Sequence, residues 1–489
     1  MHNGSVADGS VLAMPKPNII LICADDMGYG DIGCYGAEKI PTPSIDSIAS
    51  NGATFTDAHS SSAVCTPSRY SILTGRYCWR SPLKRWVLGG FGTPLIEKER
   101  LTLASIMKPR GYSTCIIGKW HLGLNWTDTK GKFRAPNYEL SGLKDNGYDI
   151  DYSVPVTGGP IDLGFDYWFG ISGSLDMPPY CFIENNRTVG IPDQEKYPLF
   201  QQQRKGLMVP EWRDDLVDIT FADRACEYIE THRRTKPDQP FFLYLPTAAP
   251  HRPCDIRPDF IIGSSAAGDR GDMVCLFDWV VGRIGETVDR LGITENTLLI
   301  VTSDNGARRT CFDGNTYSHK SNGNFRGQKS DIWDGGHREP FVAQWPGKIQ
   351  PGTTSNELIC LVDLFTTIAD ITGATFPSHA AEDSCTIWPA LQGKPLPNRN
   401  RSIVHHSGNG MFSIRQGKWK LVDGLGSGGF TEPKFEEPEP DGPRGQLYNL
   451  EEDPEETLNV WKEEEDMVTQ LSAELEQIKK AGAINRGIA

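Results

Sequence analysis

The chain has 489 residues, of which 38% are hydrophobic and 23% are charged, a balance typical of globular proteins. This length exceeds one compact core of ordinary size, so two domains are expected. The 49 basic and 63 acidic side chains give a net charge of -14, which argues against a nucleic-acid partner. The charge leaves a small anionic substrate open, because a cleft can be locally positive on an acidic protein. No apolar run reaches the length of a membrane span.

The first segment, residues 1–14, is predicted to be a leader or a disordered tail. Met1 to Leu12 lacks the charged start and apolar centre of a signal peptide. The 12 cysteines of the chain include no C-x-x-C pair, which disfavours a zinc ribbon, and their spacing leaves any disulfide pairing open.

Four short apolar runs predict buried strands of an α/β sheet, at residues 18–24, 113–117, 240–245 and 297–302. Helical patterns are predicted at residues 44–51, 103–108, 219–232, 273–291 and 361–371. Strands that alternate with helices predict a large, mostly parallel sheet flanked by helices on both faces.

A short helix is expected after the loop at residues 60–64. Thr66 fits its N-cap and Pro67 its first helical position. Cys65 then lies at a helix N-terminus, where backbone N–H groups and the helix dipole favour an anion and lower the pKa of a thiol. Arg69, one turn later, adds a second anion-binding element.

Residues 125–215 lose all periodicity and read as insertion loops over a site. Residues 395–398 read as a linker, so a catalytic domain is predicted over residues 15–397 and a C-terminal subdomain over 398–489. Strands are expected at residues 402–406 and 411–422, followed by a terminal helix at 467–480. The adjacent His405 and His406 fit a strand that alternates core and solvent, and we leave them out of any metal set.

Each of the four apolar strands runs into polar residues at its carboxyl end, where open α/β sheets bind ligands. These residues are Asp25-Asp26, Lys119-Trp120-His121, His251-Arg252 and Asp304-Asn305. Adjacent carboxylates repel each other unless a cation lies between them. A set with only oxygen ligands favours Ca²⁺ or Mg²⁺ over zinc. The alternative for Asp25-Asp26 is a solvated turn.

Six segments, in this order along the chain, resemble the type I, formylglycine-dependent sulfatases of the alkaline-phosphatase-like superfamily. These are Asn18 to Gly33, Cys65-Thr66-Pro67-Ser68-Arg69 (C-x-P-x-R), Gly118 to Gly123 (GKWHLG), Pro250-His251-Arg252-Pro253, and Ser303 to Gly306 followed by Asn324 to Pro340. The resemblance implies that family's fold: a large mixed sheet with a smaller C-terminal α+β domain that carries an antiparallel sheet. It also implies hydrolysis of a sulfate ester through a formylglycine-sulfate intermediate on modified Cys65.

The resemblance also implies roles for individual residues. Asp25, Asp26, Cys65, Asp304 and Asn305 would bind calcium, with magnesium as the alternative. Arg69, with the cation, would lower the pKa of the hydroxyl on modified Cys65 and hold it in line with sulfur, and Lys119 and Lys329 would neutralise the sulfate oxygens. His251, with Lys329, would protonate the departing alcohol, His121 would remove a proton from the remaining hydroxyl, and Ser174 would contact the site. Ser174 is the weakest match, because its loop departs from the family pattern.

Three functions remain open at this point: a sulfatase, a phosphate or phosphonate monoester hydrolase of the same superfamily, and an inactive protein that binds sulfated glycans. The expected partners are a sulfated small molecule or glycan and an enzyme, formylglycine-generating or anaerobic, that matures Cys65. The resemblance implies a periplasmic or secreted protein, while the lack of a visible signal peptide leaves the cytoplasm open.

Overall fold

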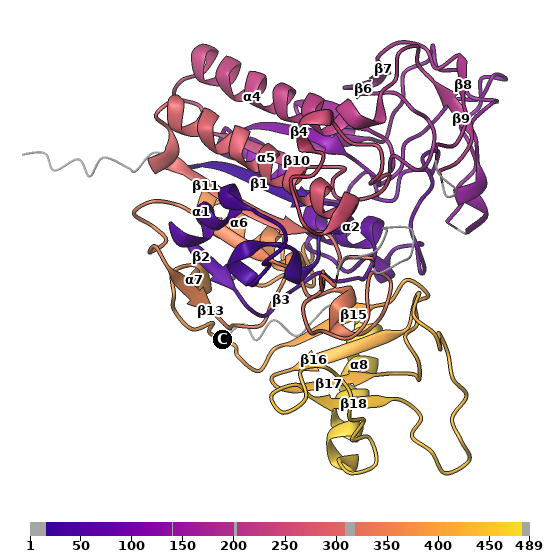
Figure 1. Ribbon diagram of the computed structural model, residues 1–489, viewed down its shortest axis with the longest axis vertical. Coiled ribbons are helices and arrows are strands. Elements are labelled where there is room, and N and C mark those ends of the chain that lie inside the picture. Colours follow the sequence, from indigo (N-terminus) through magenta and orange to yellow (C-terminus); the bar gives the residue numbers. More distant parts are fainter. Residues whose placement is uncertain (1–15, 139, 200–202, 309–317, 482–489) are drawn as a thin grey trace, which may run out of the picture.

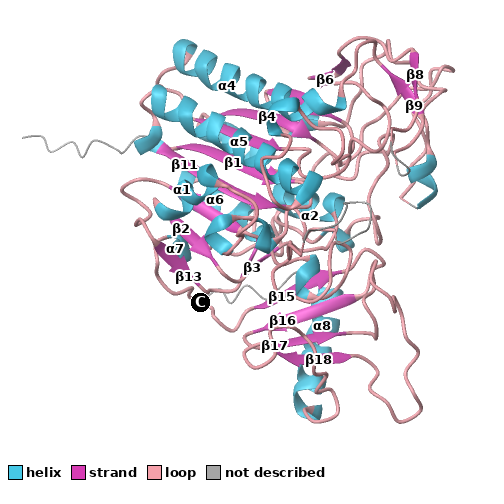
Figure 2. Ribbon diagram, viewed as in Figure 1, coloured by secondary structure: helices cyan, strands magenta, loops and turns pink. Residues whose placement is uncertain are grey.

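The computed structural model describes residues 16–138, 140–199, 203–308 and 318–481. The predicted leader at residues 1–14 lies outside these ranges. Within them, the chain forms a ten-stranded mixed sheet with helices on both faces and a four-stranded antiparallel sheet beside it (Figure 1). Long loops gather around β6, β8 and β9 (Figure 2). No described helix is long and apolar enough to cross a membrane.

The centre of the large sheet is parallel. β1 (Asn18–Ala24) lies between β10 (Phe241–Pro246) and β11 (Thr297–Ser303), and β4 (Ser113–Lys119) and β5 (Tyr167–Ile171) continue the parallel sheet beyond β10. The full order is β13-β2-β12-β11-β1-β10-β4-β5-β6-β7. The remaining strands of this part of the chain are short: β2 (Ala53–Phe55), β3 (Ala58–His59), β6 (Ile183–Glu184), β7 (Arg187–Thr188), β8 (Gln194–Lys196), β9 (Gly206–Met208), β12 (Phe341–Gln344), β13 (Thr353–Ser355) and β14 (Ile359–Cys360).

Alternate residues of β1 face opposite sides of the sheet, and both sides are buried. Ile19 and Leu21 pack in the core that contains α2 (Cys65–Thr74), α3 (Leu103–Met107), α6 (Leu364–Thr372) and α7 (Trp388–Leu391). Ile20 and Ile22 pack in the core that contains α1 (Pro43–Ser50), α4 (Val217–Thr235) and α5 (Gly268–Arg290). Burial on both faces explains why the central strands read as continuous apolar runs.

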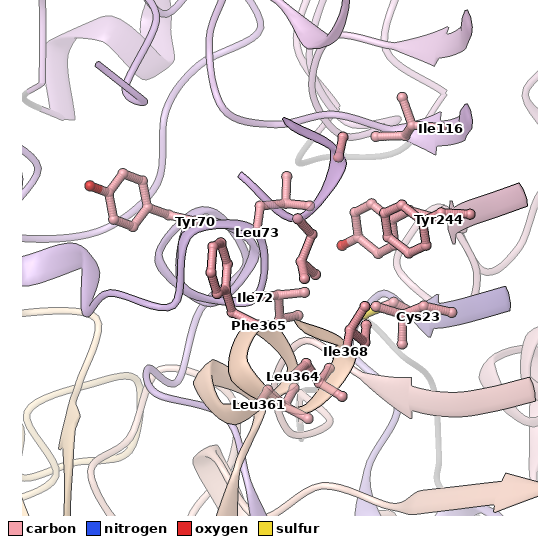
Figure 3. Close-up of a cluster of buried hydrophobic side chains, with 14 of the residues drawn as sticks. Cys23, Tyr70, Ile72, Leu73, Ile116, Tyr244, Leu361, Leu364, Phe365 and Ile368 are labelled. Atoms are coloured by element: carbon pink, nitrogen blue, oxygen red, sulfur yellow. The ribbon is translucent and has the colours of Figure 1, made fainter. Parts of the chain in front are cut away.

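The core on the α2 side fixes the helix that begins at Cys65. Figure 3 shows the apolar side chains of α2 against those of α6 and of the central strands; the labelled residues are Cys23, Tyr70, Ile72, Leu73, Ile116, Tyr244, Leu361, Leu364, Phe365 and Ile368. Burial of several large apolar side chains on one helix makes its position costly to change.

The smaller sheet has the order β15-β16-β17-β18, and α8 (Glu465–Ala481) packs against it. Its strands are β15 (Ser402–His406), β16 (Phe412–Gln416), β17 (Trp419–Val422) and β18 (Gln446–Asn449). β15 reaches the large domain, because the Ala63 N–H donates to the His406 carbonyl at 3.1 Å. The segment before Cys65 is therefore held by the small sheet.

The predicted fold class is confirmed, and all four apolar runs are strands of the parallel centre. The prediction of loops alone over residues 125–215 is wrong, because β5, β6 and β7 of the large sheet and the β8-β9 pair lie in this range. Residues 167–171 form β5, which pairs with β4 inside the large sheet. This strand is short and surrounded by turn residues, so no period-2 pattern distinguishes it from its neighbours.

Candidate active site at the carboxyl edge of the sheet

The predicted site residues meet at the carboxyl ends of the central strands. Asp25 and Asp26 follow β1, Lys119 ends β4, His251 follows β10, and Asp304 follows β11. All five side chains are buried. Because β1 lies between β10 and β11, with β4 next to β10, these strand ends deliver their polar residues to one place.

Three of these acids and Cys65 form a compact donor set. Ligand atoms of Asp25, Asp26, Cys65 and Asp304 all lie within 4.8 Å of one another. Asn305 donates its side-chain N–H to Asp26 Oδ1 at 2.7 Å, whereas its own Oδ1 is buried without a hydrogen-bond partner. Three carboxylates and an unpaired amide oxygen fit a hard divalent cation.

The turn after β1 is a strained element that the sequence did not reveal. Asp26 has φ of +69°, a left-handed conformation that is costly for a residue with a side chain. Arg270 of α5 holds it, since its guanidinium donates to the Asp26 carbonyl at 2.7 Å and forms a two-point ion pair with Asp31. His319 lies 2.9 Å from the same Asp31 carboxylate.

Cys65 is the first residue of α2 rather than the residue before its cap. Val64 occupies the N-cap position without a side-chain hydrogen bond, so the expected Thr66 cap is wrong. The Thr66 hydroxyl instead donates to the His121 carbonyl at 2.9 Å. This contact ties the helix to the segment after β4.

The Cys65 thiol faces the acids, with its sulfur 3.3 Å from Asp25 Oδ1 and 3.5 Å from Lys329 Nζ. Burial raises the pKa of this thiol well above its ordinary value, and the Asp25 charge raises it further. The expected lowering by the helix terminus is therefore wrong for the unmodified residue, because desolvation outweighs a partial dipole charge.

Three cations surround the acids. Lys119 Nζ lies 2.6 Å from Asp25, Lys329 Nζ lies 2.5 Å from Asp26, and Arg69 Nε lies 2.8 Å from Asp304. Burial alone raises the pKa of Asp25, but the charges of Lys119, His251 and Arg69 together hold it well below its usual range. The arrangement can therefore neutralise several anionic oxygens at once.

In each of the two histidines, His121 and His251, one ring nitrogen contacts a backbone carbonyl and the other makes no hydrogen bond to the described chain. His121 Nε2 lies 2.8 Å from the Leu88 carbonyl, to which it donates, and Nδ1 is buried without a partner. His251 Nδ1 lies 2.9 Å from the Arg252 carbonyl, and its Nε2 lies 3.7 Å from Asp26. Burial lowers the pKa of His251 to about 4 and that of His121 well below its ordinary value. Burial therefore disfavours the charged form of both rings.

Ser174 is buried but makes no hydrogen bond to the other predicted site residues within the described chain. Its neighbour Asp176, which the sequence analysis did not single out, is the charged member of that loop. Burial raises the pKa of Asp176, but His251, Arg252 and Arg204 lower it to about 2. The signal in the sequence was the same Gly173-Ser174-Leu175-Asp176 segment.

A second group with metal-ligand residue types lies between the two sheets: His59, His337 and His405. The rings of His337 and His405 stack at 4.0 Å with planes 11° apart, so their in-plane lone pairs run side by side rather than converge. His405 and His406 are both buried, which corrects the expected alternation of core and solvent. We assign the group to the polar packing of the two sheets. Among the described residues, no two cysteines form a disulfide with each other.

Comparisons with known proteins agree with this geometry. A family model described as sulfatase matches residues 17–374, and one described as N-sulphoglucosamine sulphohydrolase, C-terminal, matches residues 327–481. The chain is 32% identical to an N-acetylgalactosamine-6-O-sulfatase of Bacteroides thetaiotaomicron, covering 95% of this chain and 93% of the relative. It is also 32% identical to human arylsulfatase A, covering 85% of this chain and 76% of that protein.

Solved structures show the same fold. One from work on the metabolism of multiple glycosaminoglycans by Bacteroides thetaiotaomicron has a TM-score of 0.80 and 31% identity, covering 95% of this chain and 99% of that one. A phosphonate monoester hydrolase of Agrobacterium radiobacter, at 18% identity and a TM-score of 0.60, shares the fold alone. The sulfatase family model matches most of the chain, and the buried site is built from the segments that resemble this family. This chain therefore belongs to the sulfatase family and is a hydrolase of sulfuric esters.

Proposed function

We propose that the protein removes the 6-O-sulfate group from an N-acetylgalactosamine residue of a sulfated glycan. This substrate is supported by the match to an N-acetylgalactosamine-6-O-sulfatase, which covers 95% of this chain and 93% of that relative. Human steryl-sulfatase has a similar identity of 30%, but this chain covers only 74% of its length. Loops outside the shared core decide the substrate, and the N-acetylgalactosamine enzyme shares them over most of its length.

The proposed metal ligands are Asp25, Asp26, Asp304, Asn305 and modified Cys65, and the proposed cation is Ca²⁺. When bound, it would neutralise sulfate oxygens and lower the pKa of a hydroxyl beside it. The orphaned Asn305 Oδ1 and the three carboxylates support this assignment, because carboxylate and amide oxygens are ligands that Ca²⁺ prefers. Lys119 and Lys329 would then turn from Asp25 and Asp26 toward the sulfate.

Cys65, converted to formylglycine, would add one water to form a gem-diol, and one of its two hydroxyls would attack sulfur; the aldehyde would return when sulfate leaves. Arg69 holds the surrounding carboxylates in place, and Lys119 and Lys329 would bind the sulfate oxygens. His251 would protonate the departing sugar oxygen through Nε2. Its low pKa in the free protein arises from burial, and a bound sulfate raises that pKa by adding a negative charge beside the ring.

His121 would take a proton from the second hydroxyl of the modified residue, so that inorganic sulfate leaves. Its geometry suits a base, because the Nε2–H is committed to Leu88 and Nδ1 keeps its lone pair. The net reaction consumes one water and yields the sugar alcohol and inorganic sulfate.

The test compares sulfate release from N-acetylgalactosamine 6-sulfate, its 4-sulfate isomer, N-acetylglucosamine 6-sulfate and the matching 6-phosphate. The protein is produced in a host that matures Cys65, and peptide mass spectrometry across Cys65 verifies the aldehyde. We expect a kcat/KM for the first sugar about 10²-fold or more above the others. Equal or faster phosphate release would contradict the proposed preference for a sulfate ester, and a thiol at Cys65 with no turnover would favour a glycan-binding protein.

A further inference from the structure

A basic cavity opens at the end of the large sheet opposite the active site. It has a volume of about 960 Å³, and its charged lining consists of Lys16, Arg110, Arg233, Lys236 and Asp238, with His232 at its wall. Asn18, the first residue of β1, also lines it. Seven extended residues separate Asn18 from Asp25, so the cavity lies about 23 Å from the acids of the active site.

The cations of this cavity have no carboxylate partner within the described chain. Lys16 donates to the Arg110 carbonyl at 2.7 Å, Arg233 to the Pro237 carbonyl at 2.5 Å, and Lys236 to the Ser113 hydroxyl at 3.3 Å. Arg110 donates to the Thr372 carbonyl at 3.1 Å. All these acceptors are neutral, which is unusual in a chain with 14 more acidic than basic side chains.

The ordinary explanation is that the cations compensate helix dipoles, because α4 and α5 both end beside the cavity. The charges of the helix ends and of Asp238 are too small to balance all the cations. Each helix end carries roughly -0.5 charge, and Asp238 adds one negative charge. Four cations against a total of about -2 leave an excess of about +2 around one hollow.

A second observation points to a ligand. His232 is 6% exposed, and its Nε2 is buried without a hydrogen-bond partner. A second hollow of about 450 Å³ shares His232 and Lys236 with the cavity, but Asp166, Glu184 and Glu227 line it, so the anion-binding region is the first cavity alone. A buried hydrogen-bonding group without a partner and cations that contact only neutral acceptors are elements that bind an anionic sugar chain.

We propose that the basic cavity binds a sulfated polysaccharide chain, as an anchoring site separate from the active site. The choice of a sulfated glycan rests on the proposed function, whereas the preference for a polyanion rests on the charges described above. The volume exceeds what a single inorganic anion fills and lies at the upper end of the range of about 300–1,000 Å³ typical of ligand pockets. The site would keep the enzyme on a polymeric substrate while other residues of the chain reach the catalytic centre.

The experiment measures binding of a chondroitin 6-sulfate decasaccharide by calorimetry at several salt concentrations. All proteins carry Cys65→Ala, which prevents turnover. The cavity variant adds Arg233→Glu and Lys236→Glu, and the control adds Lys394→Glu and Lys462→Glu, which are exposed residues outside the cavity with the same change in charge. We expect the cavity variant to bind about tenfold or more weakly, with a smaller salt dependence, and the control to bind as the parent does.

Unchanged affinity in the cavity variant would overturn the proposal, as would displacement of the decasaccharide by inorganic sulfate at equal ionic strength. With Cys65 restored, the cavity variant should hydrolyse a small aryl sulfate at the parent rate, which shows that it folds, and should slow on the polymer. If the parent protein binds the decasaccharide but the enzyme with Cys65 hydrolyses no 6-sulfated sugar, the proposed function is contradicted and the proposed anchoring site is not. Loss of binding only in the control would place the glycan elsewhere.

Discussion

Two effects oppose each other at single residues of the site. Burial disfavours the charged form of each acid, and the neighbouring cations favour it. Asp304 shows the strain of this arrangement, since burial raises its pKa to about 6 although Arg69 opposes the shift. A divalent cation would favour its charged form and remove that strain. Substitution of Asp304 therefore tests the proposed metal ligands most directly.

Asp304→Ala should lose the metal and the activity together, because the remaining acids no longer complete a shell for a hard cation. The measurement is the metal content of the purified protein by elemental analysis, with turnover of an aryl sulfate. Glu339→Gln is the control at another buried carboxyl, which accepts a hydrogen bond from the Ser60 hydroxyl at 3.2 Å and lies outside the donor set. Zinc without calcium or magnesium in the active wild type would refute the assignment.

The role of His251 depends on how badly the leaving group needs a proton. A nitrophenolate leaves readily and a sugar alkoxide does not, so His251→Ala should slow a sugar sulfate about 10²–10⁴-fold and an aryl sulfate far less. His121→Ala should instead slow the release of sulfate from the enzyme, whichever alcohol left first. Single-turnover kinetics on both substrates separate the two steps. Equal losses on both substrates in His251→Ala would reduce it to a sulfate contact and turn attention to Lys329.

At the scale of elements, α5 does more than cover the sheet. Its Arg270 reaches the turn after β1 and holds the Asp26 backbone in a left-handed conformation. The helix thus holds one proposed metal ligand, Asp26, in place through its contacts with the Asp26 carbonyl and with Asp31.

Arg270→Met should weaken metal binding about 10–100-fold, the usual cost of losing a group that orients a ligand. Calcium titration followed by tryptophan fluorescence or calorimetry gives the affinity, and added calcium should restore much of the turnover. Arg283→Met is the control on the same helix, since Arg283 pairs with the exposed Asp223. Activity that calcium cannot restore would show a general loss of structure instead.

At the scale of the whole molecule, the small sheet is part of the active site's support. β15 holds the segment before Cys65 through the Ala63 contact, and the His406 N–H donates to the Ser61 carbonyl at 3.3 Å. We propose that residues 398–489 form a subdomain that depends on the catalytic part, with the boundary at 397. The contacts predict that residues 15–397 alone do not hold Cys65 in place.

His406 gives this contact a pH dependence. It is buried, and burial lowers its pKa to about 4 from an ordinary value of 6.5. Between pH 6.5 and about 4, His406 binds a proton in the unfolded chain but not in the folded protein. Its contribution to the free energy of unfolding is therefore complete above pH 6.5 and is lost as the pH drops toward 4. The loss amounts to about 3 kcal/mol. Urea unfolding at several pH values should show this loss in the wild type and its reduction in His406→Phe; identical pH profiles would contradict the assignment.

The sequence by itself determined the strands of the parallel centre, the family and the residues at the strand ends. Each of these depends on local information, namely apolar runs of strand length and short segments such as C-x-P-x-R. Because parallel strands end at one edge, the convergence of Asp25, Lys119, His251 and Asp304 followed from the strand order expected of such a sheet.

Only the tertiary structure decided the features that depend on burial or on distant partners. The raised pKa of the Cys65 thiol comes from burial, which no local pattern reports. Strand β5 owes its place to pairing with β4, and the Asp26 turn owes its shape to Arg270, more than 240 residues away. The basic cavity likewise brings Lys16 and Arg233 together from opposite parts of the chain, because desolvation and contacts between distant segments exist only once the chain is folded.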